Sequence, residues 1–436
     1  MKCSGTMAPL RVCLDACSVS GTSGGAEQVI IGLASGLSKL ADGDEEYLFL
    51  TYADADDWIR PHVYGPCRIL PGPRAPRSQV WKGAVDATLL SVMPWAMPLA
   101  REAWYRLSGL KNLSRKEKCP VPKSDGTIEK AGIDIMHFTT PGGFLTAVPS
   151  IYQPFDLQHV HLPHLFSEAA RATRERQYPI FCRQARMIPA MTTWVKNDLI
   201  RHFNLPEEKV RVVPLAPVLA EYPVPTEDDL AAARQKFALP ESFAFYPAQT
   251  WAHKNHIGLL EALVVLRDRY RLTVPFVFSG RLNAHFPHIR RRVEELGLAS
   301  QVRFLGFVSP LELQSLYKLC RCIIFPSKFE GWGMPLTEAF FAGVPAACSN
   351  VTSLPEQAGD AALIFDPERP EEIAAAIHRL WTDAELRRTL AARGRARVAR
   401  FTWERTARLL RAHYRRLAGR ALTEEDRELL RAPDLV

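Results

Sequence analysis

The sequence predicts an α/β protein built from two doubly wound domains that face a cleft. Short apolar strands alternate with amphipathic helical patterns, and the alternation restarts after a proline- and acid-rich stretch at 214–229. A chain of 436 residues is long enough for two or three domains that each bury a core. We therefore expect domains at 1–215 and 216–401, and a final helix at 402–436 that packs back across both.

The first domain is expected to open with a strand at 11–14, a glycine-rich turn at 18–25 and an amphipathic helix. This order is typical of nucleotide-binding α/β domains, because backbone without Cβ atoms can approach a phosphate. The match is weak, since neither a G-x-G-x-x-G fingerprint nor a P-loop lysine is present, and a purely structural turn is the alternative. Further elements are expected at 46–52, 133–138, 150–155, 187–191, 197–203 and 210–214.

The second domain repeats the alternation. An almost unbroken apolar run at 273–279 is typical of a central parallel strand. Ser309 and Glu312 form a capping box around Pro310, which predicts a helix start. The other strands are expected at 243–246, 302–307 and 322–325, and the other helices at 257–266 and 289–296.

The stretch at 329–339, directly after the last of these strands, joins two carboxylates and two glycines to a helix start. Pro335 suits the first helical position, and Gly343 marks the expected end. Glu330 falls in the loop before this helix and Glu338 about one turn inside it. Free amides from 331 to 336 and the helix dipole would suit a phosphate or sugar hydroxyls. An ordinary helix N-terminus is the alternative.

Charge is unevenly distributed. The net charge of +8 permits contact with nucleic acid, anionic lipid or a phosphorylated substrate without choosing among them. A basic insertion is expected at 72–130, and between 72 and 125 its basic residues are interleaved with tryptophans, a mixture that suits a membrane surface or a lipid-linked acceptor. A solvated insertion is the alternative, and for the arginine-rich pattern at 387–420 a solvated, salt-bridged face is favoured. The three tryptophans are Trp81, Trp95 and Trp104.

Several observations favour a cytoplasmic protein, with peripheral contact at the inner face of the membrane as a further expectation. No apolar run approaches the length of a membrane span, and the first ten residues lack the apolar core of a secretion signal. The nine cysteines show no paired zinc-ligand spacing, which favours buried thiols over disulfides or metal.

Two other polar clusters are candidate sites. Asp54 and Asp56 form a D-x-D pair, but acidic residues after a strand commonly cap the next helix, so we expect no metal there. His159 and His161 follow Asp156 after a predicted strand, at the end of a parallel sheet where ligands bind, although surface histidines are the alternative.

Glu330 and Glu338, with Gly-Trp-Gly-Met-Pro-Leu-Thr between them, resemble the E-x7-E motif of retaining glycosyltransferases of family 4. Three further segments, 24–27, 253–256 and 353–356, extend the similarity to the bacterial group 1 mannosyltransferase-like branch. The resemblance implies a GT-B fold of two Rossmann-like domains. It also implies metal-independent transfer with retained anomeric configuration.

The resemblance assigns roles to individual residues. Glu338 would hydrogen-bond the nucleotide ribose, Glu330 would contact the donor sugar, and Lys254 would neutralise the diphosphate. Gly25 would lend its amide to the same phosphates. The remaining donor-binding candidates are Gly331, Gly333, Met334, Pro335, Leu336, Thr337, Gln249 and Arg281.

Two positions depart from the family pattern. Gln249 stands near where many relatives carry an arginine, so Arg281 would substitute as the second cation. Phe155 stands where relatives often carry a histidine, so His159 or His161 would take over contact with the sugar, with His159 as the catalytic candidate.

The function expected from the resemblance is transfer of a sugar, with mannose from GDP-mannose as the first guess, to a saccharide or lipid-linked saccharide hydroxyl. No cofactor, metal or nucleic acid is expected. The alternatives are a GT-B phosphorylase or hydrolase, and a nonenzymatic protein that binds nucleotide sugars or nucleic acid.

Overall fold

The computed structural model describes residues 8–19, 24–76 and 120–433. The chain forms two compact units, and the N-terminal unit is discontinuous: it comprises the described residues up to 216 together with 401–433. The C-terminal unit comprises residues 217–400. Most of the predicted basic insertion, with its three tryptophans, lies outside the described residues.

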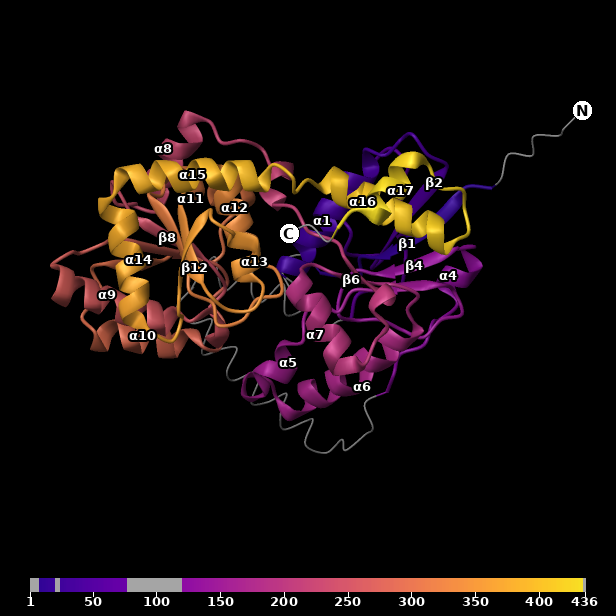
Figure 1. Ribbon diagram of the computed structural model, residues 1–436, viewed down its shortest axis with the longest axis horizontal. Helices are drawn as coiled ribbons and strands as arrows, with labels where there is room; N and C mark the ends of the chain where they lie inside the picture. The colour runs from indigo at the N-terminus through magenta and orange to yellow at the C-terminus, as the bar shows by residue number, and fades with distance from the viewer. Residues whose placement is uncertain (1–7, 20–23, 77–119, 434–436) are drawn as a thin grey trace, which may run out of the picture. The chain divides into compact units, whose positions relative to one another are not determined.

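The N-terminal unit is built on a five-stranded parallel sheet of order β3-β2-β1-β4-β5 (Figure 1). The strands predicted at 46–52, 133–138 and 150–155 are confirmed to within three residues. The strand β3 was not predicted, because its sequence Cys-Arg-Ile-Leu-Pro is short and mixed. The strand bounds are β1 (Leu10–Asp15), β2 (Glu45–Thr51), β3 (Cys67–Pro71), β4 (Ile135–Phe138) and β5 (Ser150–Tyr152), with β6 (Ile188–Ala190) and β7 (Val210–Val212) forming a separate parallel pair.

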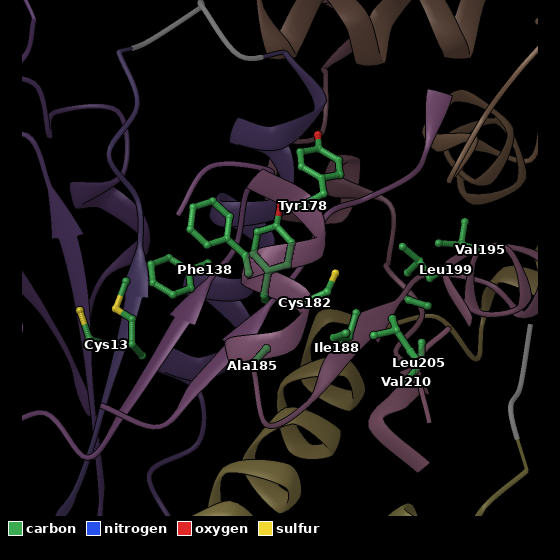
Figure 2. Close-up of a cluster of buried hydrophobic side chains, with 14 of the residues drawn as sticks. Cys13, Phe138, Tyr178, Cys182, Ala185, Ile188, Val195, Leu199, Leu205 and Val210 are labelled. Carbon is green, nitrogen blue, oxygen red and sulfur yellow. The ribbon is translucent and has the colours of Figure 1, made fainter. Parts of the chain in front are cut away.

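A buried apolar cluster joins this sheet to the helices that follow it. Figure 2 shows members of this cluster: Phe138 of β4, Tyr178 and Cys182 of helix α6, Ile188 of β6, and Leu199 of helix α7. Burying one such side chain contributes about 1.5–3 kcal/mol, so the cluster fixes these helices against the sheet. The helices on this side are α4 (Thr127–Lys130), α5 (Gln158–His161), α6 (Glu168–Gln184) and α7 (Thr193–Phe203).

The end of the chain completes the N-terminal unit. Helix α16 (Trp403–Leu417) packs on helix α1 (Gly25–Ser38), and α17 (Glu424–Arg431) packs on α16. The Trp403 side chain is fully buried, and a Cβ atom at Gly32 or Gly36 of α1 would collide with that residue. Glycine is therefore required at both positions for the two helices to approach.

Buried ion pairs hold α16 in place. Arg415 donates to Glu45 at 2.6 Å and to Asp426 at 2.9 Å, and all three side chains are less than a tenth exposed. The Arg411 side chain is 2% exposed and pairs at 2.5 Å with Asp42, whose side chain is 56% exposed. The expected solvated face is therefore wrong for Arg411 and Arg415, whose side chains are buried.

The C-terminal unit contains a six-stranded parallel sheet of order β10-β9-β8-β11-β12-β13. Helices α9, α10 and α14 pack together on one face, and α8, α11, α12 and α15 on the other (Figure 1). The two doubly wound sheets confirm the predicted fold class. The strands are β8 (Ala244–Pro247), β9 (Phe276–Ser279), β10 (Val302–Phe304), β11 (Cys322–Phe325), β12 (Ala346–Ser349) and β13 (Ala362–Phe365).

Helix starts in this unit agree with the sequence signals. The Ser309 side chain accepts from the Glu312 amide and Glu312 reaches back to Ser309, as the capping box predicts. None of the described helices is both long and apolar enough to cross a membrane. The helices are α8 (Glu227–Lys236), α9 (His256–Tyr270), α10 (Phe286–Glu295), α11 (Pro310–Leu319), α12 (Met334–Ala342), α13 (Leu354–Ala358), α14 (Pro370–Thr382) and α15 (Ala384–Val398).

We expect Arg415→Ala to lower the free energy of unfolding of the N-terminal unit by about 3–5 kcal/mol, because it leaves two buried carboxylates unpaired. Arg427→Ala is the matched control, since its pair with Glu424 is exposed and such pairs are worth about 0–1 kcal/mol. Urea unfolding followed by circular dichroism measures both, and equal effects of the two changes would contradict the assignment.

Candidate functional site

The strand order of the C-terminal sheet identifies where a ligand should bind. The chain crosses from β8 to β9 on one side and from β11 to β12 on the other, although β8 and β11 are neighbours. The loops after these two strands therefore diverge at the carboxyl edge of the sheet, which is the usual ligand position in doubly wound folds. Lys254 lies in the first loop and Glu330 in the second.

Lys254 and Glu330 form a close ion pair at this point. The Lys254 Nζ lies 2.5 Å from the Glu330 Oε1, and the two side chains are 18% and 9% exposed. Lys254 ends a short 3-10 helix, Ala252–Lys254, and its carbonyl accepts the Tyr246 hydroxyl at 2.9 Å. The following residue, Asn255, has a positive φ of 55° and caps α9. The lysine is thus presented by a turn that is fixed at both ends.

The Glu330 backbone is held by residues that follow β12. Its amide donates to the Thr352 Oγ1 at 3.0 Å, and its carbonyl accepts from the hydroxyls of Thr352 and Ser353 at 2.8 Å each. Ser353 lies in a segment that the family resemblance identifies, but no sequence signal indicated Thr352. These bonds fix the loop from which the Glu330 carboxylate projects.

The start of α12 differs from the expectation of free amides. The Gly333 amide donates to the Gln357 Oε1 at 2.8 Å, and the amides of Met334 and Leu336 have backbone acceptors. Pro335 carries no N–H, and the Thr337 amide bonds back to Gly333. The expectation is therefore wrong for Gly333, Met334 and Leu336. The amides of Gly331 and Trp332 precede these bonds in the chain.

Gly333 itself is required by packing. A Cβ atom there would lie 2.5 Å from the Leu354 Cδ2 and 2.8 Å from the Phe325 Cε1, both of them side chains of the surrounding core. The glycine lets the loop pass over β11 and α13 before the helix begins. Its role in the structure is therefore to position the helix N-terminus.

Glu338 is buried at the fifth position of α12, with 3% of its surface exposed. Its Oε2 accepts the Tyr317 hydroxyl at 2.7 Å, while its Oε1 is buried without a hydrogen-bond partner. Burial raises the pKa of Glu338 to about 7, against the opposing effect of the Tyr317 hydrogen bond. A buried oxygen without a partner is costly, and a ligand hydroxyl would satisfy it. The predicted ribose contact itself stays a prediction.

Gln249 and Arg281 follow neighbouring strands of the same sheet. The Thr250 amide donates to the Arg281 carbonyl at 3.2 Å, so the two loops are tied together. Gly280 has a φ of 124°, and a Cβ atom there would lie 2.5 Å from the Ala248 carbonyl, which explains why glycine precedes Arg281. The Gln249 Oε1 already accepts the Trp251 indole N–H at 3.0 Å. The phosphate contacts predicted for Gln249 and Arg281 stay predictions.

The N-terminal sheet has its own divergence point, between β1 and β4. Gly25 begins α1 after β1, behind Gly24 with its positive φ of 52°, and a Cβ atom at Gly25 would meet nothing within 4 Å. The loop after β4, which contains Gly142 and Gly143, lies on the other side of the divergence. Sequence reasoning included Gly25 but missed this second loop, because strand order is not visible in a sequence.

His159 lies elsewhere, after β5, the last strand of the five-stranded order. Its ring is buried against Tyr178 and Phe166, at centroid distances of 5.1 and 6.3 Å. Burial, followed by the charge of Arg174, lowers the pKa of His159 to about 4, so the ring is neutral at neutral pH. His161 instead contacts the Asp198 carboxylate at 2.9 Å. Contact of either histidine with a sugar stays a prediction.

The D-x-D pair has structural partners. Asp54 accepts the Ala75 amide at 2.8 Å, and Asp56 pairs with Arg60 at 2.6 Å. Both carboxylates therefore stabilise the segment after β2.

The raised pKa of Glu338 gives a pH test of its burial. The folded protein binds this proton more tightly than the unfolded chain does, because the pKa of Glu338 is higher in the fold. The resulting contribution to the free energy of unfolding is complete below the ordinary pKa of 4.5 and is lost as the pH rises through about 7. The shift corresponds to about 3 kcal/mol. We expect Glu338→Gln to gain stability relative to the wild type, by up to that amount, between about pH 5 and pH 8. Urea unfolding at both pH values measures this, with the exposed Glu368→Gln as control; parallel curves for wild type and Glu338→Gln would refute it.

Two family models match successive parts of the chain. The model of the glycosyl transferases group 1 matches residues 229–397, and that of glycosyltransferase family 4 matches residues 23–216. Among curated relatives, the O-antigen chain mannosyltransferase B of Escherichia coli is 34% identical over 221 residues, which are 50% of this chain and 58% of that protein. The serotype-specific mannosyltransferase WbdA of Escherichia coli is 33% identical over 190 residues, 43% of this chain and 23% of that protein. The match thus spans less than two thirds of either relative.

Solved structures share the fold over almost the whole chain. HepE of Anabaena, determined with UDP and glucose, superposes with a TM-score of 0.65 at 17% identity over 93% of this chain and 99% of that one. WaaG, a glycosyltransferase involved in lipopolysaccharide biosynthesis, superposes with a TM-score of 0.60 at 15% identity over 94% of this chain and 100% of that one. The two units are therefore the two Rossmann-like domains of a GT-B fold. By the two family models, which together span residues 23–216 and 229–397, the chain belongs to the group 1 glycosyltransferases of family 4.

Proposed function

We propose that the protein transfers a sugar, with retention of anomeric configuration and without a metal ion, from a nucleotide-diphosphate sugar to a hydroxyl of a saccharide or lipid-linked saccharide. The observation that carries the proposal is the Lys254–Glu330 pair at the divergence of β8 and β11. The Lys254 ammonium would bind the diphosphate, and the adjacent Glu330 carboxylate would accept hydrogen bonds from the sugar hydroxyls. Both lie at the edge of the sheet where ligands bind in doubly wound folds.

The chemistry requires negative charge to be stabilised on the leaving diphosphate. The Lys254 ammonium, held in a mostly buried position, is preorganised for that charge. We propose front-face attack: the bond from the anomeric carbon to the phosphate oxygen breaks, the acceptor oxygen bonds to the same face, and its proton passes to the leaving phosphate. No side chain of the protein is assigned as nucleophile.

The relatives guide the choice of donor. The two Escherichia coli relatives are named as mannosyltransferases, and HepE was determined with UDP and glucose. We propose mannose from GDP-mannose as the first donor to test, with the buried Glu338 oxygen accepting a ribose hydroxyl. The acceptor is proposed as a saccharide because the relatives named for O-antigen synthesis build such chains.

Transfer is tested by release of nucleotide from a panel of nucleotide sugars, with and without EDTA. We expect Lys254→Ala and Glu330→Ala each to lower turnover by about 100-fold or more, as the loss of a preorganised transition-state contact does. Lys328→Ala is the matched control, because Lys328 lies two residues from Glu330 but pairs at 2.6 Å with the exposed Glu368. Full turnover in both site variants would refute the assignment.

The same assay separates the alternatives. Turnover that EDTA abolishes and Mg²⁺ or Mn²⁺ restores would contradict the metal-free proposal. Nucleotide release that needs no acceptor indicates a hydrolase, and sugar phosphate made with inorganic phosphate indicates a phosphorylase. Binding of donor without any release indicates a nonenzymatic protein, and affinity for nucleic acid that falls steeply with salt indicates a nucleic-acid binder.

The ion pair also predicts how nucleotide affinity changes. The Glu330 carboxylate pairs with the Lys254 ammonium, which is the group that a diphosphate would contact. We expect Glu330→Gln to bind GDP about 10-fold more tightly, corresponding to about 1.4 kcal/mol, because the ammonium is no longer neutralised. Calorimetric titration measures this, with Glu368→Gln expected to leave affinity unchanged; unchanged or weaker GDP binding by Glu330→Gln would show that the two groups do not compete.

A further inference from the structure

Three side chains of the N-terminal unit meet in one cluster, and only one of them, His161, is also a candidate for contact with the sugar. The His161 Nε2 lies 2.9 Å from both carboxylate oxygens of Asp198, and the His202 Nδ1 lies 3.1 Å from the Asp198 Oδ1. The two imidazole rings are 5.3 Å apart. One ligand atom from each of the three residues lies within 4.8 Å of the others, and within the described ranges no other group of three His, Cys, Asp or Glu side chains comes so close.

The cluster is built on rigid elements. Asp198 and His202 stand four residues apart on α7, so their side chains share one face of the helix. Between them on the chain, Leu199 is buried in the apolar core, which fixes the helix in rotation (Figure 2). His161 comes from α5, across from this face. The cluster therefore joins two segments that are far apart in sequence.

The spacing fits a tetrahedral ion. Zinc binds histidine nitrogen and carboxylate oxygen at about 2.0–2.2 Å, which places ligand atoms of neighbouring residues about 3.3 Å apart. The observed nitrogen-to-oxygen distances of 2.9 and 3.1 Å need to open by only a few tenths of an ångström. Asp198 is buried, whereas the side chains of His161 and His202 are 32% and 28% exposed. An ion can thus enter from solvent, and water can take the fourth position.

One nitrogen of each ring, the His161 Nε2 and the His202 Nδ1, faces oxygen acceptors. The His202 Nδ1 also contacts the backbone carbonyl of Asp198 at 2.9 Å. Each of these nitrogens therefore carries a proton that it donates. A metal ion would replace that proton, which moves to the other ring nitrogen or to solvent, and the carboxylate would become a ligand in place of a hydrogen-bond acceptor.

We propose that His161, Asp198 and His202 form a binding site for a divalent transition-metal ion of the zinc class, with two imidazoles, one carboxylate and a water as ligands. Nitrogen and carboxylate ligands favour zinc, cobalt or nickel over magnesium or calcium, which prefer oxygen alone. The ion would link α5 to α7 inside the N-terminal unit. This proposal does not depend on the proposed transfer reaction, whose assigned pair, Lys254 and Glu330, lies in the C-terminal unit.

The test is titration of the EDTA-treated, dialysed full-length protein with Co²⁺, followed by its visible absorption, and with Zn²⁺, followed by calorimetry and by the thermal unfolding midpoint. We expect one ion per chain and a higher midpoint with Zn²⁺. His202→Ala and Asp198→Asn should each weaken binding by about 100-fold or more, since changes even to outer-shell partners cost about 10- to 100-fold. His164→Ala is the matched control, because His164 is exposed three residues from His161.

The outcomes are distinct. Stoichiometric binding that both ligand variants abolish and His164→Ala preserves supports the site. Absence of stoichiometric binding, or binding that survives in His202→Ala and Asp198→Asn, overturns it. Circular dichroism of each variant without metal shows whether it is folded, and His161→Ala provides a third ligand variant should one of the other two fail to fold.

Discussion

The site of the C-terminal unit depends on one constraint: a lysine and a glutamate that are both mostly buried must be satisfied by each other or by a ligand. Lys254 and Glu330 come from opposite sides of the point where the strand order reverses. Hydrogen bonds to the backbone fix the two loops that present them. Thr352 and Ser353 fix the Glu330 loop, and the packing around Gly333 sets the start of α12. The charges are thus held close together at the place where a diphosphate sugar is proposed to bind.

Local signals in the sequence were sufficient for much of the fold. The capping box at Ser309, the strand at 322–325 and the end of α12 at Gly343 depend on neighbours in sequence, and each agrees with the structure. The two glutamates of the motif were identified in the same way. Contacts between distant residues were not predictable. Tyr317 holds Glu338 from 21 positions away, and Gln357 occupies the Gly333 amide from 24 positions away.

Charged residues show the same limit. An arginine-rich helical pattern indicates a solvated face, because exposure is the usual state of arginine. Arg415 is paired inside the unit with Glu45 and Asp426, and the buried Arg411 side chain pairs with the partly exposed Asp42. No pattern along the chain indicates these contacts between distant residues. His159 likewise follows a strand, as a ligand-binding residue would. Only the strand order shows that this strand lies beyond β4, away from the divergence between β1 and β4.

The discontinuity of the N-terminal unit has a consequence for biosynthesis. A ribosome completes residues 217–400, and with them the whole C-terminal unit, before it makes α16. Until then the surface of α1 at Gly32 and Gly36 lacks Trp403, and Glu45 lacks the guanidinium of Arg415. The packing of the N-terminal unit therefore cannot be completed until α16 has been synthesised, although most of that unit is translated first. Apolar surface of α1 and the Glu45 carboxylate stay uncovered until then.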